Sequence, residues 1–167
     1  MSSIAVTEAL TVLELRQYTL HPGRRDTLIA LFEREFVEPQ EAVGARILGT
    51  FRDLDRPDHF VWLRGFADMA ARADALGAFY GGPAWQAHRN TANATMVDSD
   101  DVHLLRPLVG DQALQAALQP RPPVDAAPEA AGVFTITLCP LRRPADDALL
   151  CTSFTTPTIR IQAGQVR

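Results

Sequence analysis

The sequence predicts an α+β fold in which an antiparallel sheet carries its helices on one face. The first observation is the order of hydrophobic patterns in residues 1–107, which reads strand–helix–strand–strand–helix–strand, the ferredoxin-like βαββαβ arrangement. The second is that the third predicted strand is apolar on both faces, whereas a sheet covered on one side alternates. The uncovered face is therefore expected to meet another sheet, and two copies paired in this way would form a dimeric α+β barrel.

The first strand is expected over Val12–Leu20, because its side chains alternate between two faces. Leu13 and Leu15 share one face. The other face carries Glu14, Arg16 and Tyr18.

A turn at residues 21–23 leads into the first helix, whose apolar residues recur at helical spacing. These residues are Leu28, Leu31, Phe32 and Phe36. Pro39 is expected to kink or end this helix, since proline has no amide hydrogen to donate.

The second and third strands are expected over Arg46–Arg52 and His59–Phe66, joined by a polar turn at Leu54–Asp58. Asp68 can cap a second helix that runs to Tyr80, because an aspartate side chain accepts from the free amides at a helix start.

Gly81 and Gly82 are expected to break this helix, and Pro83 suits the first position of a further helical piece. The fourth strand is expected over Val102–Leu105. The acidic residues just before it are expected in a solvated turn, with a hard-cation site as the alternative. They are Asp98, Asp100 and Asp101.

Composition excludes several classes of function. The chain of 167 residues has 16 arginines, no lysine and a net charge of −4, so lysine-based Schiff-base chemistry, a pyridoxal phosphate anchor and a P-loop are excluded. No nucleic-acid footprint and no membrane span are expected. Met1–Leu10 lacks the features of a targeting signal, and two cysteines, Cys139 and Cys151, do not suggest a disulfide scaffold. We therefore expect a cytoplasmic protein.

Prolines are denser after residue 107 than before it, which divides the chain into two parts at this point. Residues 108–132 are rich in alanine and proline and are expected to form a linker. Residues 133–152 partly repeat the pattern of residues 12–31, which indicates the start of a second βα unit, although chance similarity is an alternative. We therefore expect residues 133–167 to be a partial second repeat or an extended tail.

The segments ELRQYTLHPG, GTFRDLDRPDHFVWLRGF, FYGGPAWQAHRNTANATM and DDVHLLRP, between Leu13 and Pro107, resemble the NIPSNAP family. The resemblance implies a ferredoxin-like dimeric α+β barrel, and often two such domains in tandem. This chain departs from the tandem pattern, because its second unit looks incomplete. The resemblance implies no defined activity. Eukaryotic relatives are linked to mitochondria and to vesicle or mitophagy roles, which the missing presequence argues against here.

No catalytic signature is present in the chain. The patterns G-x-S-x-G, H-E-x-x-H, C-x-x-C and G-x-G-x-x-G are all missing, and we expect no metal and no cofactor.

The most suggestive group combines aromatic residues with two arginines. Tyr18, Trp62, Tyr80 and Trp85 come from elements that border the space between sheet and helices, where a small apolar or aromatic molecule could bind. Arg16 and Arg64 could bind a carboxylate or a planar acceptor. The alternative is that the rings form the core and that the arginines pair with Glu14 or Asp53.

Two histidines complete the set of candidate ligand-binding residues. His59 opens the third strand, where it could be a general base at a cleft mouth or a solvated strand-end residue. His88 follows Trp85 on the last helix, where it could contact a ligand or have a structural role.

Three functions are compatible with these observations. The first is a homodimeric protein that binds a small molecule between sheet and helices. The second is an enzyme resembling the cofactor-independent monooxygenases found among dimeric α+β barrels. The third is an interaction module without a ligand, which a core with no cavity would favour.

Overall fold

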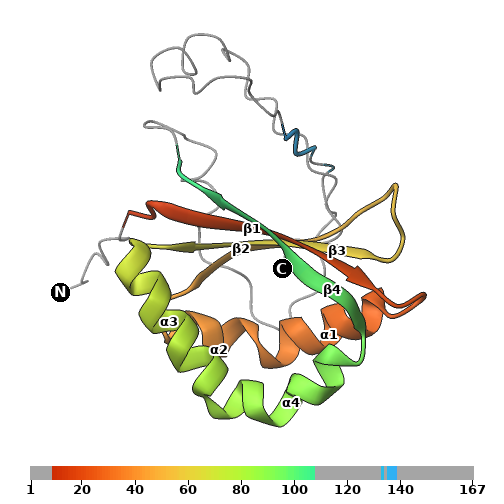
Figure 1. Ribbon diagram of the computed structural model, residues 1–167, viewed down its shortest axis with the longest axis horizontal. Coiled ribbons are helices and arrows are strands. Elements are labelled where there is room, and N and C mark those ends of the chain that lie inside the picture. Colours follow the sequence, from red (N-terminus) through yellow and green to blue (C-terminus); the bar gives the residue numbers. More distant parts are fainter. Residues whose placement is uncertain (1–8, 108–132, 134, 139–167) are drawn as a thin grey trace, which may run out of the picture.

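The computed structural model describes residues 9–107, 133 and 135–138 (Figure 1). The first of these ranges forms the elements in the predicted order, with the two helical stretches each split in two. They are β1 (Val12–Leu20), α1 (Arg25–Glu35), α2 (Val37–Ala42), β2 (Arg46–Arg52), β3 (His59–Phe66), α3 (Met69–Gly81), α4 (Pro83–Asn93) and β4 (Met96–Leu105).

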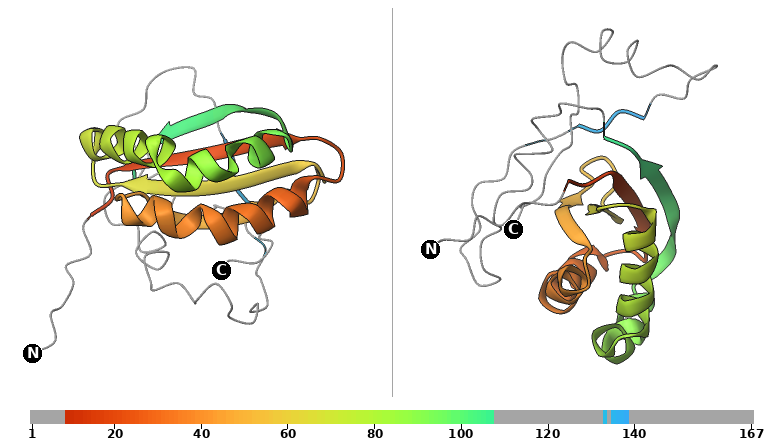
Figure 2. Two further views of the ribbon diagram at one scale, coloured as in Figure 1. Left: turned by 90° about the horizontal axis from the view of Figure 1, so that it is seen from below. Right: turned by 90° about the vertical axis from the view of Figure 1, so that its left-hand side faces the viewer.

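The strands form one antiparallel sheet in the order β2-β3-β1-β4. All helices lie on the same side of this sheet, as the two views of Figure 2 show. We call this side the helix face and the other side the open face. The ferredoxin-like α+β fold predicted from the sequence is therefore confirmed. The predicted pairing of two sheets into a barrel stays a prediction.

Three strand predictions agree with the structure to the residue, but the fourth was wrong at its start. β4 begins at Met96 instead of Val102, so Asp98, Asp100 and Asp101 lie within a strand and not in a turn. Among the described strands β4 is at an edge and pairs with β1 alone, and charged residues are common on such edges because they discourage pairing with another chain. The described residues contain no group of three His, Cys, Asp or Glu side chains that could hold a metal.

The first helical stretch breaks at Phe36, between α1 and α2, and Pro39 explains where. A proline ring crowds the carbonyl four residues earlier, which here belongs to Glu35, the last residue of α1. The second stretch starts as predicted, because Asp68 Oδ1 accepts a hydrogen bond of 2.7 Å from the amide of Ala71.

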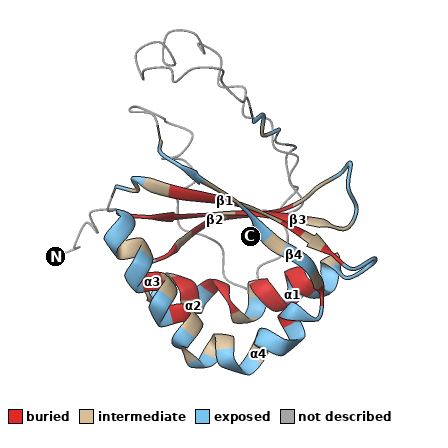
Figure 3. Ribbon diagram, viewed as in Figure 1, coloured by how far each residue is buried: buried red, intermediate tan, exposed pale blue. Residues whose placement is uncertain are grey.

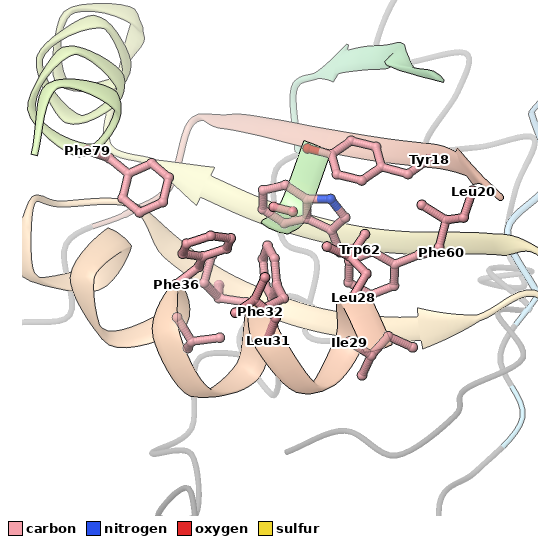
Figure 4. Packing of buried hydrophobic residues seen from close by; sticks show 13 residues of the cluster. Tyr18, Leu20, Leu28, Ile29, Leu31, Phe32, Phe36, Phe60, Trp62 and Phe79 are labelled. Carbon is pink, nitrogen blue, oxygen red and sulfur yellow. The ribbon is translucent and has the colours of Figure 1, made fainter. Parts of the chain in front are cut away.

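The main core lies between the helix face of the sheet and the helices. Figure 3 shows that buried residues concentrate on the strands and on the helix surfaces turned toward them. In the close view of Figure 4, the Trp62 ring lies between the rings of Tyr18 and Phe32. The centroids are 5.9 Å apart for Tyr18 and Trp62 and 4.7 Å apart for Phe32 and Trp62, both in edge-to-face geometry.

The open face carries a smaller apolar cluster, which we call the open-face cluster, formed by Leu15, Phe51 and Val61. Phe51 joins this cluster because β2 contains a bulge. The register between β2 and β3 shifts between Ile47 and Gly49, so that Ile47 points to the helix face and Phe51 to the open face. Ile136, from the short described segment after residue 132, packs against this cluster.

The predicted linker 108–132, most of the predicted repeat 133–167 and both cysteines lie outside the described residues. Among the described helices, none combines the length and apolar character that a membrane crossing requires. The cytoplasmic location stays a prediction.

Two glycine substitutions should have opposite effects on stability. A Cβ atom on Gly49 would lie 2.5 Å from the Phe51 ring, which is itself buried, so Gly49→Ala is expected to lower the free energy of unfolding by about 1 kcal/mol or more. Gly77 lies within α3 with open space around it, so Gly77→Ala is expected to raise that free energy by roughly 0.5–1 kcal/mol. Urea denaturation measures both, and a neutral Gly49→Ala would contradict the tight contact.

Candidate functional site

A pocket of about 250 Å³ lies between the helix face of the sheet and the helices. Aromatic side chains are the largest group in its lining, together with five polar or charged side chains. The lining includes Arg16, Tyr18, Phe36, Gln40, Trp62, Phe79, Tyr80, Trp85, Asn93, Ser99 and Asp100. Since Asn93 and Asp100 are exposed, the mouth opens between the end of α4 and β4.

Strand alternation places the sheet side of the pocket. Arg16 and Tyr18 are two residues apart on β1, and Trp62 is the cross-strand partner of Arg16 on β3, so all three project to the helix face. The Arg16 guanidinium carbon lies 5.5 Å from the centroid of each of the two rings, Tyr18 and Trp62. This places a cation against the aromatic wall.

The helix side of the pocket is built from residues of all four helices, α1 to α4, and from Phe36 between α1 and α2. Trp85 contacts three other rings in this wall, with centroid distances of 5.0 Å to Tyr80, 5.5 Å to Phe36 and 5.9 Å to Phe79. Gly82 and Pro83 end α3 and start α4, which turns Trp85 back toward the rings of α3. The ring contacts make this wall suited to a flat apolar molecule.

β4 supplies the polar rim of the pocket. Its register against β1 shifts between Gln17 and Leu20, and the residues opposite this irregularity, Ser99 and Asp100, line the pocket. The carbonyl of Ser99 accepts a long hydrogen bond of 3.4 Å from Arg16 Nη2.

Behind the pocket, three arginines converge on one buried carboxylate, Glu14. Glu14 Oε2 accepts from Arg64 Nε at 2.7 Å and from Arg16 Nη1 at 3.1 Å, and Oε1 accepts from Arg72 Nε at 2.6 Å. Arg64 Nη1 also donates to Gln40 Oε1 at 2.8 Å. We call these five residues the Glu14 cluster. Three positive charges face one negative charge in it, so it carries a surplus of two positive charges.

The Glu14 cluster holds its carboxylate ionised. Burial alone would raise the pKa of Glu14, but the charge and hydrogen bond of Arg64, with those of Arg72 and Arg16, hold that pKa below its ordinary value. Burial acts in the same way on Tyr18, where it raises the pKa of the hydroxyl despite the opposing charge of Arg16. Tyr18 therefore stays protonated at neutral pH. Its oxygen accepts from Arg16 Nε at 3.1 Å, which leaves its proton to donate elsewhere.

Two buried donors beside the pocket have no hydrogen-bond partner among the described residues. They are Nη2 of Arg64 and Nε1 of Trp62. Leaving a buried polar group unpaired costs roughly 1–3 kcal/mol. The site therefore holds more donors than its own acceptors satisfy.

The structure brings most of the predicted ligand-binding residues together. Arg16, Tyr18, Trp62, Tyr80 and Trp85 line the pocket. Arg64 lies just behind this lining, in contact with Gln40 and with its guanidinium carbon 5.0 Å from the Trp62 centroid.

The two predicted histidines are not among the lining residues. His88 Nε2 lies 3.4 Å from Glu35 Oε2 at the end of α1, and the His88 ring centroid lies 6.3 Å from that of Phe36. His59 pairs with Thr19 and shares the strand parity of Val61, so it points to the open face. Burial, with the charge of Arg56, lowers the pKa of His59, and its Nδ1 has no partner among the described residues.

Gln40 and Arg72 also belong to the site, although the sequence did not predict them. Gln40 follows Pro39 in α2, and the one feature that could have indicated its role is that a polar residue occupies an inward-facing position of this helix. Arg72 lies 58 residues after Glu14, and a salt bridge across that separation leaves no local pattern. The alternative that Arg16 and Arg64 pair with an acidic residue of the chain is observed, and that residue is Glu14. Asp53 instead pairs with Arg56.

Removing the central carboxylate should strongly destabilise the fold. Glu14→Gln leaves three guanidinium groups without their counter-charge, so the free energy of unfolding at pH 7 is expected to fall by about 3 kcal/mol or more. Glu35→Gln breaks solvent-accessible pairs with Arg34 and His88 and serves as the control with little change. Equal effects of the two changes would contradict the central role of Glu14.

The same carboxylate predicts a pH dependence. The pKa of Glu14 is lower in the folded chain than its ordinary value of 4.5, so the unfolded chain takes up the proton first as the pH falls. Its contribution to stability is therefore complete above about pH 4.5 and is lost as the pH falls from there through the folded-state pKa. Stability curves of wild type and Glu14→Gln should converge in acid.

Comparisons with known proteins agree with this fold. Residues 13–109 match the NIPSNAP family. A solved, uncharacterized NIPSNAP-like domain protein from Burkholderia xenovorans is 27% identical, with a TM-score of 0.55 and with 60% of this chain and 87% of that chain covered. A NIPSNAP family protein from Agrobacterium tumefaciens is 21% identical, with a TM-score of 0.54 and coverage of 58% and 92%, which supports the fold alone. A search of curated proteins found no match. Because the matched residues make up more than half of the chain, it belongs to the NIPSNAP family.

Proposed function

We propose that the protein binds a small molecule with a flat apolar body in the pocket between its sheet and its helices. The observation that carries this proposal is the pocket itself, which is lined by seven aromatic residues and by polar residues from β1, α2, α4 and β4. Such a combination is typical of small-molecule sites. At about 250 Å³ the pocket suits a molecule of one or two rings.

Binding without assigned chemistry is favoured over the monooxygenase-like alternative. An enzyme of that kind would need a group that takes up a proton near neutral pH. His59 and His88 are not among the lining residues, and burial keeps Tyr18 protonated. An interaction module without a ligand is disfavoured by the pocket, since a fully packed core was its expected sign.

We also propose that the chain forms a homodimer through the open face of its sheet. The open-face cluster, Leu63 and Leu105 make this face apolar, although the three residues of the cluster are already buried within the chain and only Leu105 among these five is exposed. Within the chain itself, Ile136 covers part of this surface. A second copy would therefore compete with the segment around Ile136 for the same face.

Ligand binding can be followed at the tryptophans. The chain has two tryptophans and both line the pocket, so the indole N–H signals of Trp62 and Trp85 in a ¹H–¹⁵N NMR spectrum report on it directly. Added 2-naphthamide, a neutral aromatic probe, is expected to shift both signals. Asn93→Phe should weaken this binding by about tenfold or more, because the new ring would obstruct the exposed mouth.

Asn90→Phe is the matched control, since it makes the same change on an exposed position of α4 outside the pocket lining. It should leave the titration unchanged. A probe that shifts neither indole signal, or equal effects of the two variants, would contradict binding in this pocket.

The dimer proposal predicts a specific effect of Ile136. Ile136→Asp should release the open face and shift the monomer–dimer equilibrium toward the dimer, as measured by sedimentation velocity over a concentration series. Leu138→Asp, at an exposed position of the same segment, should behave as wild type. If wild type and Ile136→Asp are both monomers at high micromolar concentration, the dimer proposal is wrong.

A further inference from the structure

We infer that the molecule bound in the pocket is an aromatic monocarboxylate whose carboxylate is held by Arg16. This inference rests on the proposed binding function and goes beyond it by assigning the charge and the orientation of the ligand. The carboxylate would lie against β1, and the rings would extend toward the aromatic wall of α3 and α4.

The charge of the Glu14 cluster favours an anionic ligand. The cluster carries a surplus of two positive charges around a buried carboxylate; Arg64 is buried with it, whereas Arg16 and Arg72 are partly exposed. Solvent and salt therefore screen the charge of Arg64 less than those of the other two arginines. Arg64 is almost fully buried and keeps an unpartnered Nη2 among the described residues. A negative charge in the adjacent pocket would reduce this surplus, whereas a neutral ligand would not.

Arg16 is the arginine of the cluster that lines the pocket, and one of its nitrogens is weakly engaged. Its Nη1 donates to Glu14 and its Nε to Tyr18, whereas within the described part of the chain its Nη2 makes only the long contact of 3.4 Å with the Ser99 carbonyl. A carboxylate oxygen is a stronger acceptor than such a carbonyl contact. The Tyr18 hydroxyl, which accepts from Arg16, can donate its proton to the same carboxylate.

The charge at the mouth of the pocket favours a ligand with a single negative charge. Asp100 lines the exposed mouth of the pocket, and its carboxylate would repel a dianion such as a phosphate monoester more strongly than a carboxylate. The wall opposite Arg16 is aromatic, with Phe36, Phe79 and Trp85 in mutual ring contact. The site therefore matches a molecule with one charged end and a flat apolar body.

The test compares two probes of nearly the same shape, 2-naphthoate and its neutral amide 2-naphthamide, each titrated into the full-length protein and followed at the two indole signals. We expect 2-naphthoate to bind about tenfold more tightly or better. Arg16→Met should reduce this ratio to near one, because it removes both the charge and the donors that face the pocket. Arg89→Met, at an exposed position of α4 outside the lining, should keep the ratio.

Arg16→Lys keeps the positive charge but loses the planar guanidinium group with its paired donors, so it provides the test if Arg16→Met does not fold. It should weaken binding of 2-naphthoate and leave that of 2-naphthamide unchanged. Equal affinity of the two probes for wild type would overturn the carboxylate assignment while the proposed binding function stands. Tighter binding of 2-naphthyl phosphate would also overturn it. If neither aromatic probe binds at millimolar concentration, the proposed function itself fails.

Discussion

The ionised carboxylate of Glu14 is the interaction on which the arrangement of the molecule depends. Glu14 and Arg64 are direct cross-strand partners on the two central strands, so their ion pair also specifies the register between β1 and β3. Arg72 attaches α3 to the same carboxylate, and Gln40 attaches α2 through Arg64. The Glu14 side chain thus connects the sheet to both helical stretches, α1–α2 and α3–α4.

The Glu14 cluster also divides the helix face into two apolar regions. Along β3, Phe60 and Trp62 belong to the main core, Arg64 is polar, and Phe66 belongs to a separate cluster with Ala45 and Ala75. A buried charged group of this kind costs desolvation energy, and a hydrophobic replacement would often be as stable. The proposed binding of a carboxylate in the adjacent pocket would give this cluster a role beyond stability.

Sequence reasoning succeeded where a single strand or helix carries its own pattern. The alternation in β1 and β3 placed Arg16, Tyr18 and Trp62 on one face, and that face lines the pocket. It failed for the start of β4, because residues 98–101 are all polar and interrupt the alternation of this edge strand. His59 has the strand parity of Val61, so the alternation of β3 already assigns it to the open face, away from the pocket. The meeting of Arg72 and Glu14 depends on how α3 packs, which no local pattern encodes.

The proposed ligand site and the proposed dimer surface lie on opposite faces of the sheet. The pocket opens between α4 and β4 on the helix face, whereas Ile136 packs on the open face, where we propose that a second copy binds. Substitution of Ile136 would therefore leave the shape of the pocket unchanged. Under these two proposals, ligand preference and assembly could be selected independently over evolutionary time, with the backbone of β1 and β3 as the part common to both.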